Sequence, residues 1–323
     1  MSVPWRFLVA LVAGFALGIV AFVGALCSQL GVATESSHWT YALLHRKQEL
    51  AAQMTGPRLL ILSGSAGLFG INAQLIQQQT GYPTMNMAVH VGLGLDYQLY
   101  YIRETARAGD TVFLPLEYAL YSTSYDNEAH DDFVLARDPG YFHQLPWPET
   151  ISMATRIRFV RLQIGWRDKR HPEKTRAHQP YEDTIDNNGD YLNNMAVDRQ
   201  PNSPLMLLKA EELLDWNAGN HSGAFAKLRD FIAWAKTHQV RVLAGFPNLI
   251  ARPEYDGPAA EQAIQAITDF YKSEGVPVIG NAREVMLPPE QFFNMSYHPT
   301  HEAALERTKR LIPELEPYLQ KGA

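Results

Sequence analysis

The chain has only one cysteine, Cys27, in 323 residues, so no disulfide can form within it. It has no strongly basic segment either, since no basic run is longer than two residues, as at Lys169-Arg170, and the net charge is −6. A nucleic-acid-binding surface needs clustered Lys and Arg to neutralise phosphates. The sequence therefore excludes nucleic acid as a partner, and it contains no internal repeat or low-complexity tract.

Hydrophobic residues, in contrast, make up 46% of the chain. At this length, such a content is sufficient for one large or two modest folded domains with a buried core.

The most continuous hydrophobic segment runs from Phe7 to Leu26 without a charged residue. About 20 such residues are needed to span a bilayer as a helix, so the sequence predicts a transmembrane anchor over residues 1–33. A cleaved signal peptide is the alternative, although its apolar region is normally only about 7–15 residues long. A lipoprotein is not favoured, because the bulky Leu26 precedes Cys27 where a small residue is expected.

The charges that flank this segment indicate its orientation. Arg6 precedes it, whereas the next basic residues after it are Arg46 and Lys47. The positive-inside rule then favours a cytoplasmic N-terminus. We expect a single-pass protein of the inner membrane with its body in the periplasm, connected to the anchor by a lead-in helix and linker over residues 34–57.

Strand and helix patterns alternate through most of residues 58–323, which we expect to form one domain. Alternation of this kind predicts an α/β fold with a mainly parallel, five-stranded, flavodoxin-like doubly wound sheet. The expected strands are Leu59–Ser63, Thr84–Met87, Thr111–Leu116, Arg241–Phe246 and Val276–Ile279. The expected helices are Leu68–Gln79, Leu95–Ala108, Pro204–Trp216, Ser222–Thr237, Gly257–Gly275 and Pro299–Leu319.

The alternation breaks from about residue 121 to residue 203, where the sequence is polar and rich in proline, asparagine and histidine. An insertion this long within a compact domain is usually functional or mobile. We interpret it as an excursion over the edge of the sheet that carries the active site.

Ser65 follows the first expected strand in the segment Gly64-Ser65-Ala66. Small residues allow a sharp turn into a helix, and ligands of doubly wound sheets bind at the carboxyl ends of the strands. A serine placed there can act as a nucleophile, although an ordinary helix N-cap is equally consistent with the local sequence.

His298 lies near the other end of the chain, after the last expected strand, and is the candidate base for Ser65. We expect a hydrogen bond between the two side chains. A base needs an orienting partner on its other ring nitrogen, and Asn294 is the local candidate, although an amide supplies no negative charge. His298 and His301 lack the order of the His-Glu-x-x-His zinc motif, so we expect no metal.

Three further residues are expected at the same edge of the sheet. Gly92 can present a backbone amide beside Ser65, and Asn86 can brace the loop before it. Glu117 follows the third strand and could be an acid, a substrate contact or a buried structural carboxylate. The sequence does not separate these three roles.

Taken together, these segments resemble the SGNH (GDSL-like) hydrolase and acyltransferase superfamily. They are most similar to its membrane-anchored bacterial branch, the DltD-like and alginate O-acetylation-like proteins. The resemblance covers most of residues 58–312. The matching blocks are Gly64-Ser65 with Leu68-Phe69-Gly70-Ile71, Asn86 through Gly92-Leu93-Gly94-Leu95, Gly109-Asp110-Thr111-Val112 leading to Glu117-Tyr118, Asn188-Gly189-Asp190, and Tyr297-His298.

The resemblance implies that Ser65 is the nucleophile, His298 the base, and the amides of Ser65 and Gly92 the oxyanion donors. The chain departs from the family pattern at three places. Asn294 stands where an aspartate is usual, Leu116-Glu117-Tyr118 replaces the Gly-x-Asn-Asp block, and Pro299-Thr300 follows the histidine.

The expected function is that of a membrane-anchored O-acyltransferase or esterase, commonly for acetyl groups, that modifies a cell-surface or secreted polysaccharide without a cofactor. The resemblance also implies a membrane-bound acyltransferase or a polysaccharide synthase complex as a partner. The alternative is an SGNH-fold scaffold or binding subunit of a polysaccharide synthesis and export complex, because of Asn294 and the missing block. The acyl donor, the polymer and the oligomeric state do not follow from the sequence.

Overall fold

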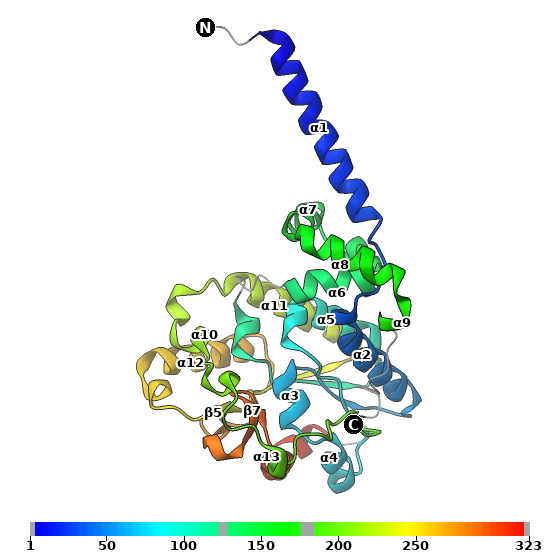
Figure 1. Cartoon of the computed structure of the whole chain (residues 1–323). Helices are drawn as coiled ribbons and strands as arrows, with labels where there is room; N and C mark the ends of the chain where they lie inside the picture. Colours follow the sequence, from blue (N-terminus) through cyan, green and yellow to red (C-terminus); the bar gives the residue numbers. More distant parts are fainter. Residues whose placement is uncertain (1–3, 123–127, 176–183, 320–323) are drawn as a thin grey trace. The chain divides into compact units, whose positions relative to one another are not determined.

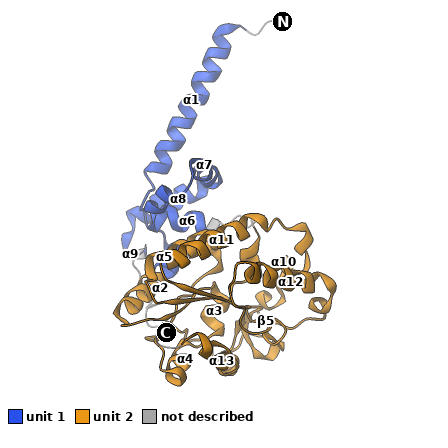
Figure 2. Cartoon of the chain, turned by 180° about the vertical axis from the view of Figure 1, so that it is seen from behind, with its two compact units in different colours: residues 1–41, 128–179 blue, residues 42–127, 180–323 orange. Residues whose placement is uncertain are grey.

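The computed structural model describes residues 4–122, 128–175 and 184–319 (Figure 1). The chain forms two compact units (Figure 2). Unit 1 contains residues 1–41 and 128–179, and unit 2 contains residues 42–127 and 180–323. Part of the segment expected to be an insertion therefore belongs to the same unit as the N-terminal helix.

Unit 2 is built around a parallel sheet of four strands in the order β2-β1-β3-β4. This order is that of a flavodoxin-like sheet, and its parallel register pairs Leu59 with both Thr84 and Thr111. The mixed α/β class and the parallel sheet expected from the sequence are confirmed. The strands are β1 (Leu59–Ile61), β2 (Thr84–Asn86), β3 (Thr111–Leu114) and β4 (Arg241–Ala244).

Helices cover both faces of this sheet (Figures 1 and 2). On one face, alternate strand residues such as Ile61, Phe113 and Leu243 pack in a buried cluster with Ile76 and Leu311. This cluster involves α4 (Ala73–Thr80) and α13 (His301–Leu315), while α5 (Gly94–Thr105) and α11 (Ser222–Thr237) lie on the opposite face (Figure 2). The remaining long helices are α2 (Glu35–Gln53), which continues from unit 1 into unit 2, and α12 (Pro258–Ser273).

Short elements complete unit 2. β5 (Leu249–Ile250) pairs in parallel with β6 (Met286–Leu287), and β7 (Phe292–Met295) pairs antiparallel with β8 (His298–Pro299). Its short helices include α3 (Ser65–Gly70), α10 (Glu211–Leu214), and the 3₁₀ turns η1 (Val91–Leu93), η2 (Tyr118–Tyr121), η5 (Ala196–Asp198), η6 (Pro204–Leu207) and η7 (Trp216–Ala218).

The fifth strand expected from the sequence does not join the sheet as a regular strand. Val276–Ile279 forms only one isolated parallel bridge, between Ala244 and Val278. Proline has no amide hydrogen and cannot donate to a strand ladder, which limits pairing at Pro277. The Pro277 carbonyl still accepts from Ala244 N at 2.9 Å, and Ile279 N donates back to Ala244 O at 2.8 Å.

Two expected helices are interrupted. Leu68–Gln79 is divided into α3 and α4 at Ile71 and Asn72, where Asn72 caps α4 by accepting from Leu75 N. Pro204–Trp216 consists of η6, α10 and η7 instead of one helix, since Arg252 binds the Met206 carbonyl at 2.7 Å. Side-chain partners therefore replace continuous helical hydrogen bonds at both places.

Unit 1 contains α1 (Trp5–Cys27), which has no buried residue and is long and apolar enough to span a membrane, although a signal sequence has the same properties. Its other helices are α6 (Glu128–Arg137), α7 (Trp147–Arg156), α8 (Phe159–Arg170) and α9 (Pro172–Thr175), with the 3₁₀ helix η3 (Pro139–Gln144). A small apolar cluster of Leu135, Ile157 and Leu162 holds them together.

Candidate active site

The turn that carries Ser65 connects β1 to α3 and is tightly packed on both sides. A Cβ atom at Gly64 would lie 2.5 Å from Glu117 Oε1 and 2.6 Å from the amide nitrogen of Val91. Only glycine fits this approach, because real Cβ atoms do not come so close to other atoms. The turn is thereby fixed between Glu117 and η1, which contains Gly92.

Glu117 holds the backbone on both sides of Ser65. One carboxylate oxygen accepts from Gly64 N and the other from Ala66 N, each at 2.8 Å, and the Ser63 hydroxyl donates to the same carboxylate at 3.1 Å. Glu117 is 2% exposed, and burial raises its pKa, while the hydrogen bonds from Ala66 and Gly64 lower it. Of the three roles that the sequence leaves open, these contacts favour a structural carboxylate that positions the nucleophile turn.

Ser65 itself lies at the first position of α3 and is 7% exposed. Among the residues that the structure describes, neither its hydroxyl nor its amide makes a hydrogen bond. Glu117 thus binds the amides on either side and leaves the middle one unpaired. An unpaired amide beside a hydroxyl, at a helix N-terminus, is suited to stabilise negative charge that develops on an attacked carbonyl.

His298 is placed by the β7–β8 hairpin, in which it pairs directly with Met295. Its Nδ1 lies 2.9 Å from Asn294 Oδ1. An amide oxygen can only accept, so this contact requires the proton on Nδ1 and leaves the lone pair on Nε2. Asn294 therefore selects the tautomer that a general base needs.

The expected hydrogen bond from Ser65 to His298 is absent. Within the described residues, Nε2 of His298 is buried and has no hydrogen-bond partner. The ring instead lies flat on Phe69, with centroids 4.0 Å apart and an interplanar angle of 2°. Phe69 is one helical turn after Ser65 on α3, so the imidazole is held beside the nucleophile's helix by stacking and by Asn294.

The surroundings keep His298 uncharged. Burial, with a smaller contribution from the neighbouring His90, lowers the pKa of His298 to about 3. Burial also lowers the pKa of His90. Both imidazoles are consequently neutral at physiological pH, as a proton acceptor must be.

Two asparagines that the sequence analysis did not single out support the hairpin. Asn194 Nδ2 donates to the Pro299 carbonyl at 3.0 Å, and Asn248 Nδ2 donates to the Tyr297 carbonyl at 2.5 Å. Both residues are buried and lie in loops. No local motif distinguishes such residues, because their partners are about 50 to 105 positions away in the chain.

Asn86 is a brace of the nucleophile helix and not a free donor. Its Nδ2 donates to the carbonyls of Gly67 and Ile71, each at 3.1 Å, and to Asp190 at 3.2 Å. Asp190 in turn accepts from Ala73 N and Gln74 N at the start of α4, each at 2.8 Å. The side chain of Asn86 is fully buried, so it supports the nucleophile helix from the interior of the protein.

Lys47 of α2 completes this support. Its ammonium donates to the carbonyls of Asn86 and Ala88 at 2.7 Å and of Gly189 at 2.8 Å. Burial lowers the pKa of Lys47 to about 7 and raises that of Asp190 to about 7. Three acceptors around one nitrogen indicate the charged form. The lead-in helix is therefore fastened directly to the backbone that follows β2.

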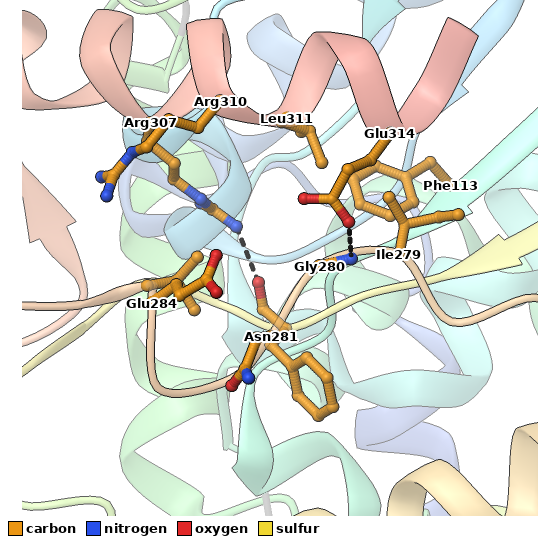
Figure 3. Close-up of a pocket in the computed structure, with 11 residues that line it drawn as sticks. Phe113, Ile279, Gly280, Asn281, Glu284, Arg307, Arg310, Leu311 and Glu314 are labelled. Carbon is orange, nitrogen blue, oxygen red and sulfur yellow. Dashed lines mark hydrogen bonds between the residues drawn. The ribbon is translucent and has the colours of Figure 1, made fainter. Parts of the chain in front are cut away.

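A hollow outside this constellation is lined by residues around Phe246, Ile279 and α13 (Figure 3). Arg307 donates to the Phe246 carbonyl at 2.6 Å, and Glu314 accepts from Gly280 N at 2.8 Å. Burial lowers the pKa of Arg307 to about 9. Arg307 and Glu314 both bind backbone groups of the protein itself. We therefore interpret these two charged side chains as structural and not as part of a ligand site.

The pKa of His298 gives a prediction for the pH dependence of catalysis. The acid limb of kcat/KM reports the base of the free enzyme, so hydrolysis of p-nitrophenyl acetate is expected to lose activity only well below the ordinary histidine pKa of 6.5. In Asn294→Asp, a carboxylate next to Nδ1 favours the imidazolium and is expected to move this limb upward by about 1–3 pH units. The pH–rate profiles of both proteins check this.

The control for this experiment is Asn217→Asp, an exposed asparagine in η7, which should leave the limb in place. An unchanged limb in Asn294→Asp would show that another group accepts the proton.

No protein-family model and no curated protein matches the chain. Its structure is similar to three solved structures at low identity. A predicted acylhydrolase from Bacteroides fragilis is 13% identical with a TM-score of 0.40, and the match covers 86% of this chain and 97% of that one. The protein YxiM from Bacillus subtilis is 11% identical with a TM-score of 0.39, and the match covers 82% of this chain and 57% of that one. A GDSL-like lipase from Bacteroides thetaiotaomicron is 11% identical with a TM-score of 0.37, and the match covers 87% of this chain and 100% of that one. Similarity at this level does not assign the chain to a family.

Proposed function

We propose that the protein is an O-acyltransferase or esterase in which Ser65 is the nucleophile and His298 the general base. One observation carries the proposal. Glu117 binds the amides on either side of Ser65, while the hydroxyl and amide of Ser65 stay unpaired, and the imidazole of His298, whose Nε2 has no partner, is stacked on Phe69 in the same helix. A nucleophile, an oxyanion donor and a base of the correct tautomer are the parts that acyl transfer requires.

In the first half-reaction, Ser65 Oγ attacks the carbonyl carbon of an acyl ester and its proton passes to His298 Nε2. The developing oxyanion is stabilised by the Ser65 amide, with that of Gly92 as the second donor. The bond to the leaving alcohol then breaks, and the alcohol leaves with the proton from Nε2. The acyl group is now an ester of Ser65.

In the second half-reaction, a sugar hydroxyl or water attacks this ester. Nε2 accepts the proton of the attacking hydroxyl and returns it to Ser65 Oγ as the acyl–serine bond breaks. Both halves require a rotation of the Ser65 or His298 side chain that brings Oγ and Nε2 into contact. No cofactor is needed, because both half-reactions consist only of proton transfers and the transfer of the acyl group.

Unpartnered hydroxyls support a polyhydroxylated acceptor. The buried hydroxyls of Tyr118 and Tyr297, which adjoin Glu117 and His298 in the chain, have no hydrogen-bond partner in the described structure. The two phenols are near enough that Tyr118 contributes to the raised pKa of Tyr297. Buried hydroxyls are normally hydrogen-bonded; in the proposal a sugar supplies the missing partners once the side chains that cover both phenols have moved, because neither oxygen is accessible in this structure.

The cellular setting in this proposal is the periplasmic side of the inner membrane. The support for it is α1, which has no buried residue and is apolar from Phe7 to its end at Cys27, with Arg6 in its first turn. A cell-surface or secreted polysaccharide is then the accessible acceptor, and a membrane-bound acyltransferase or synthase complex the source of the acyl group or the polymer.

A fluorophosphonate probe tests the proposal, because it reacts covalently with activated serines. The full chain is expected to be labelled, and labelling is expected to disappear in Ser65→Ala. Ser63→Ala is the matched control, since Ser63 is on the same turn but its hydroxyl is bound to Glu117 and Pro115. Labelling that persists in Ser65→Ala, or that is absent from folded wild-type protein, contradicts the proposal.

A second candidate function is a binding or scaffolding subunit of a polysaccharide synthesis and export complex. Two observations favour it. No hydrogen bond joins Ser65 to His298 in the described structure, and a histidine with a pKa of about 3 is a weak base. Polymer binding without probe labelling, unchanged in Ser65→Ala, is the result expected for this function.

A further inference from the structure

We propose that α7 and α8 of unit 1 lie in the surface of the lipid bilayer next to the point where α1 leaves it. The inference rests on the membrane anchoring that belongs to the proposed function. It concerns an apolar face that no described residue covers, and lipid is the occupant that this proposal assigns to it.

The apolar face consists of four large side chains on these two helices. Trp147 and Ile151 lie on α7 and are 75% and 53% exposed, and Phe159 and Val160 lie at the start of α8 and are 65% and 53% exposed. Trp147 and Ile151 are one helical turn apart, and Met153 on α7 is buried, so the helix has an inner and an outer apolar side. We call the four exposed residues the outer face.

Contacts within unit 1 place these helices at the end of α1. Ala25 and Leu26, in the last turn of α1, pack against the cluster of Leu135, Ile157 and Leu162. In both views α7 and α8 lie beside the Cys27 end of α1 (Figures 1 and 2).

Polar contacts fix the same arrangement. Just after α1, Trp166 Nε1 of α8 donates to Ser28 Oγ at 3.2 Å, and Arg161 Nη1 donates to Gln29 Oε1 at 3.3 Å. If α1 spans the bilayer, Ser28 and Gln29 lie at its surface. α8, which binds both residues, then lies there too.

The charge of this segment fits an anionic lipid surface. Residues 147–170 contain six Arg or Lys and two Asp or Glu, against a net charge of −6 for the whole chain. Some of these cations are paired inside unit 1, as Arg156 is with Asp131, but Lys169 and Arg170 are exposed at the end of α8. A helix with an apolar face, an interfacial tryptophan and basic residues lies in the plane of the membrane with its apolar side about 5–10 Å deep.

The experiment uses the full chain with Cys27→Ser, so that one introduced cysteine carries an environment-sensitive NBD label. Ile151→Cys and Phe159→Cys report on the outer face, Val12→Cys on the middle of α1, and Glu306→Cys on an exposed position of α13 in unit 2. Each protein is reconstituted in phosphatidylcholine vesicles with and without phosphatidylglycerol, and spin-labelled lipids are used as quenchers.

We expect the labels at positions 151 and 159 to shift to shorter emission wavelengths and to be quenched most strongly by shallow spin labels, more so with phosphatidylglycerol. The label at position 12 should be quenched by deep spin labels, and the label at position 306 should stay water-like. Circular dichroism of each labelled protein checks that it is folded.

The other outcomes are distinguishable. Quenching at position 12 together with water-like labels at 151 and 159 overturns the inference and leaves the anchor intact. No quenching at position 12 overturns the anchor and the inference with it. A blue shift at 151 and 159 that grows with protein concentration and does not respond to lipid quenchers shows that a second copy of the chain covers the outer face, and it also overturns the inference.

Discussion

Glu117→Gln is expected to lower the turnover of an acyl ester by about 10²–10³-fold, because the glutamine cannot accept hydrogen bonds from both sides of Ser65. The carboxylate accepts from Gly64 N and Ala66 N with its two oxygens. A glutamine has one oxygen and one NH₂ group, so an amide donor faces another donor. The turn then loses the geometry that leaves the Ser65 amide unpaired.

The same replacement is expected to reduce the free energy of unfolding by about 1–3 kcal/mol, the usual cost of a buried donor without a partner. Urea unfolding measures this cost, and p-nitrophenyl acetate hydrolysis measures turnover. Ile76→Val, in the cluster between β1 and α13, is the control: it should cost about 0.5–1.5 kcal/mol and leave turnover unchanged. If Glu117→Gln is destabilised but keeps full turnover, Glu117 stabilises the fold without positioning the nucleophile.

Much of the fold of unit 2 is predictable because its signals are local. The apolar run at Leu59, the small residues after it and the helix that begins at Ser65 are adjacent in the chain, and the structure has this strand–turn–helix arrangement. The same holds for α11, whose bounds, Ser222–Thr237, agree with the expected helix. Periodicity and turn residues determine such elements with little help from the rest of the molecule.

The roles of side chains are less predictable, because they depend on residues far apart in the sequence. The sequence places Glu117 at the active edge, yet its role follows only from its contacts with residues 51 to 54 positions earlier. Phe69 looks like an ordinary core residue of a short helix, and only the structure shows His298 stacked on it, 229 positions later. No periodic pattern encodes contacts of this kind.

The segment around residues 121–203 is the least predictable part of the chain. Its polar composition suggests one excursion, but residues 128–175 form four α-helices and the 3₁₀ helix η3 of unit 1, held by a small apolar cluster with the end of α1. The remainder, around Asn188–Asp190, belongs to unit 2 and is bound to Lys47 and Asn86. Part of the segment, residues 123–127 and 176–183, lies outside the described structure.

Lys47→Met is expected to reduce the free energy of unfolding by about 3–5 kcal/mol, because it leaves three buried carbonyl groups without their donor and removes a positive charge that interacts with the buried Asp190. The carbonyls involved are those of Asn86, Ala88 and Gly189, and the electrostatic interaction between the Lys47 ammonium and Asp190 is lost with them. Urea unfolding at about pH 7 measures the loss. Arg46→Met is the matched control: Arg46 is the preceding residue on α2, is partly exposed and pairs with the exposed Glu49 at 3.5 Å, so its replacement should cost less than about 1 kcal/mol.

The pH dependence of the stability loss in Lys47→Met distinguishes an effect of the Lys47 charge from a simple loss of packing. In the wild type, the pKa of Lys47 is about 7 in the folded chain and 10.5 ordinarily, so the unfolded chain binds more protons between these values and stability from this group rises with pH there. Lys47→Met should lack this rise. Without the ammonium, the pKa of Asp190 should move further above its ordinary value of 3.8, so the variant should lose stability as the pH rises toward that raised pKa and regain part of it below about pH 7. A loss that is the same at every pH would mean that Lys47 acts through its methylene groups and its packing, and not through its charge.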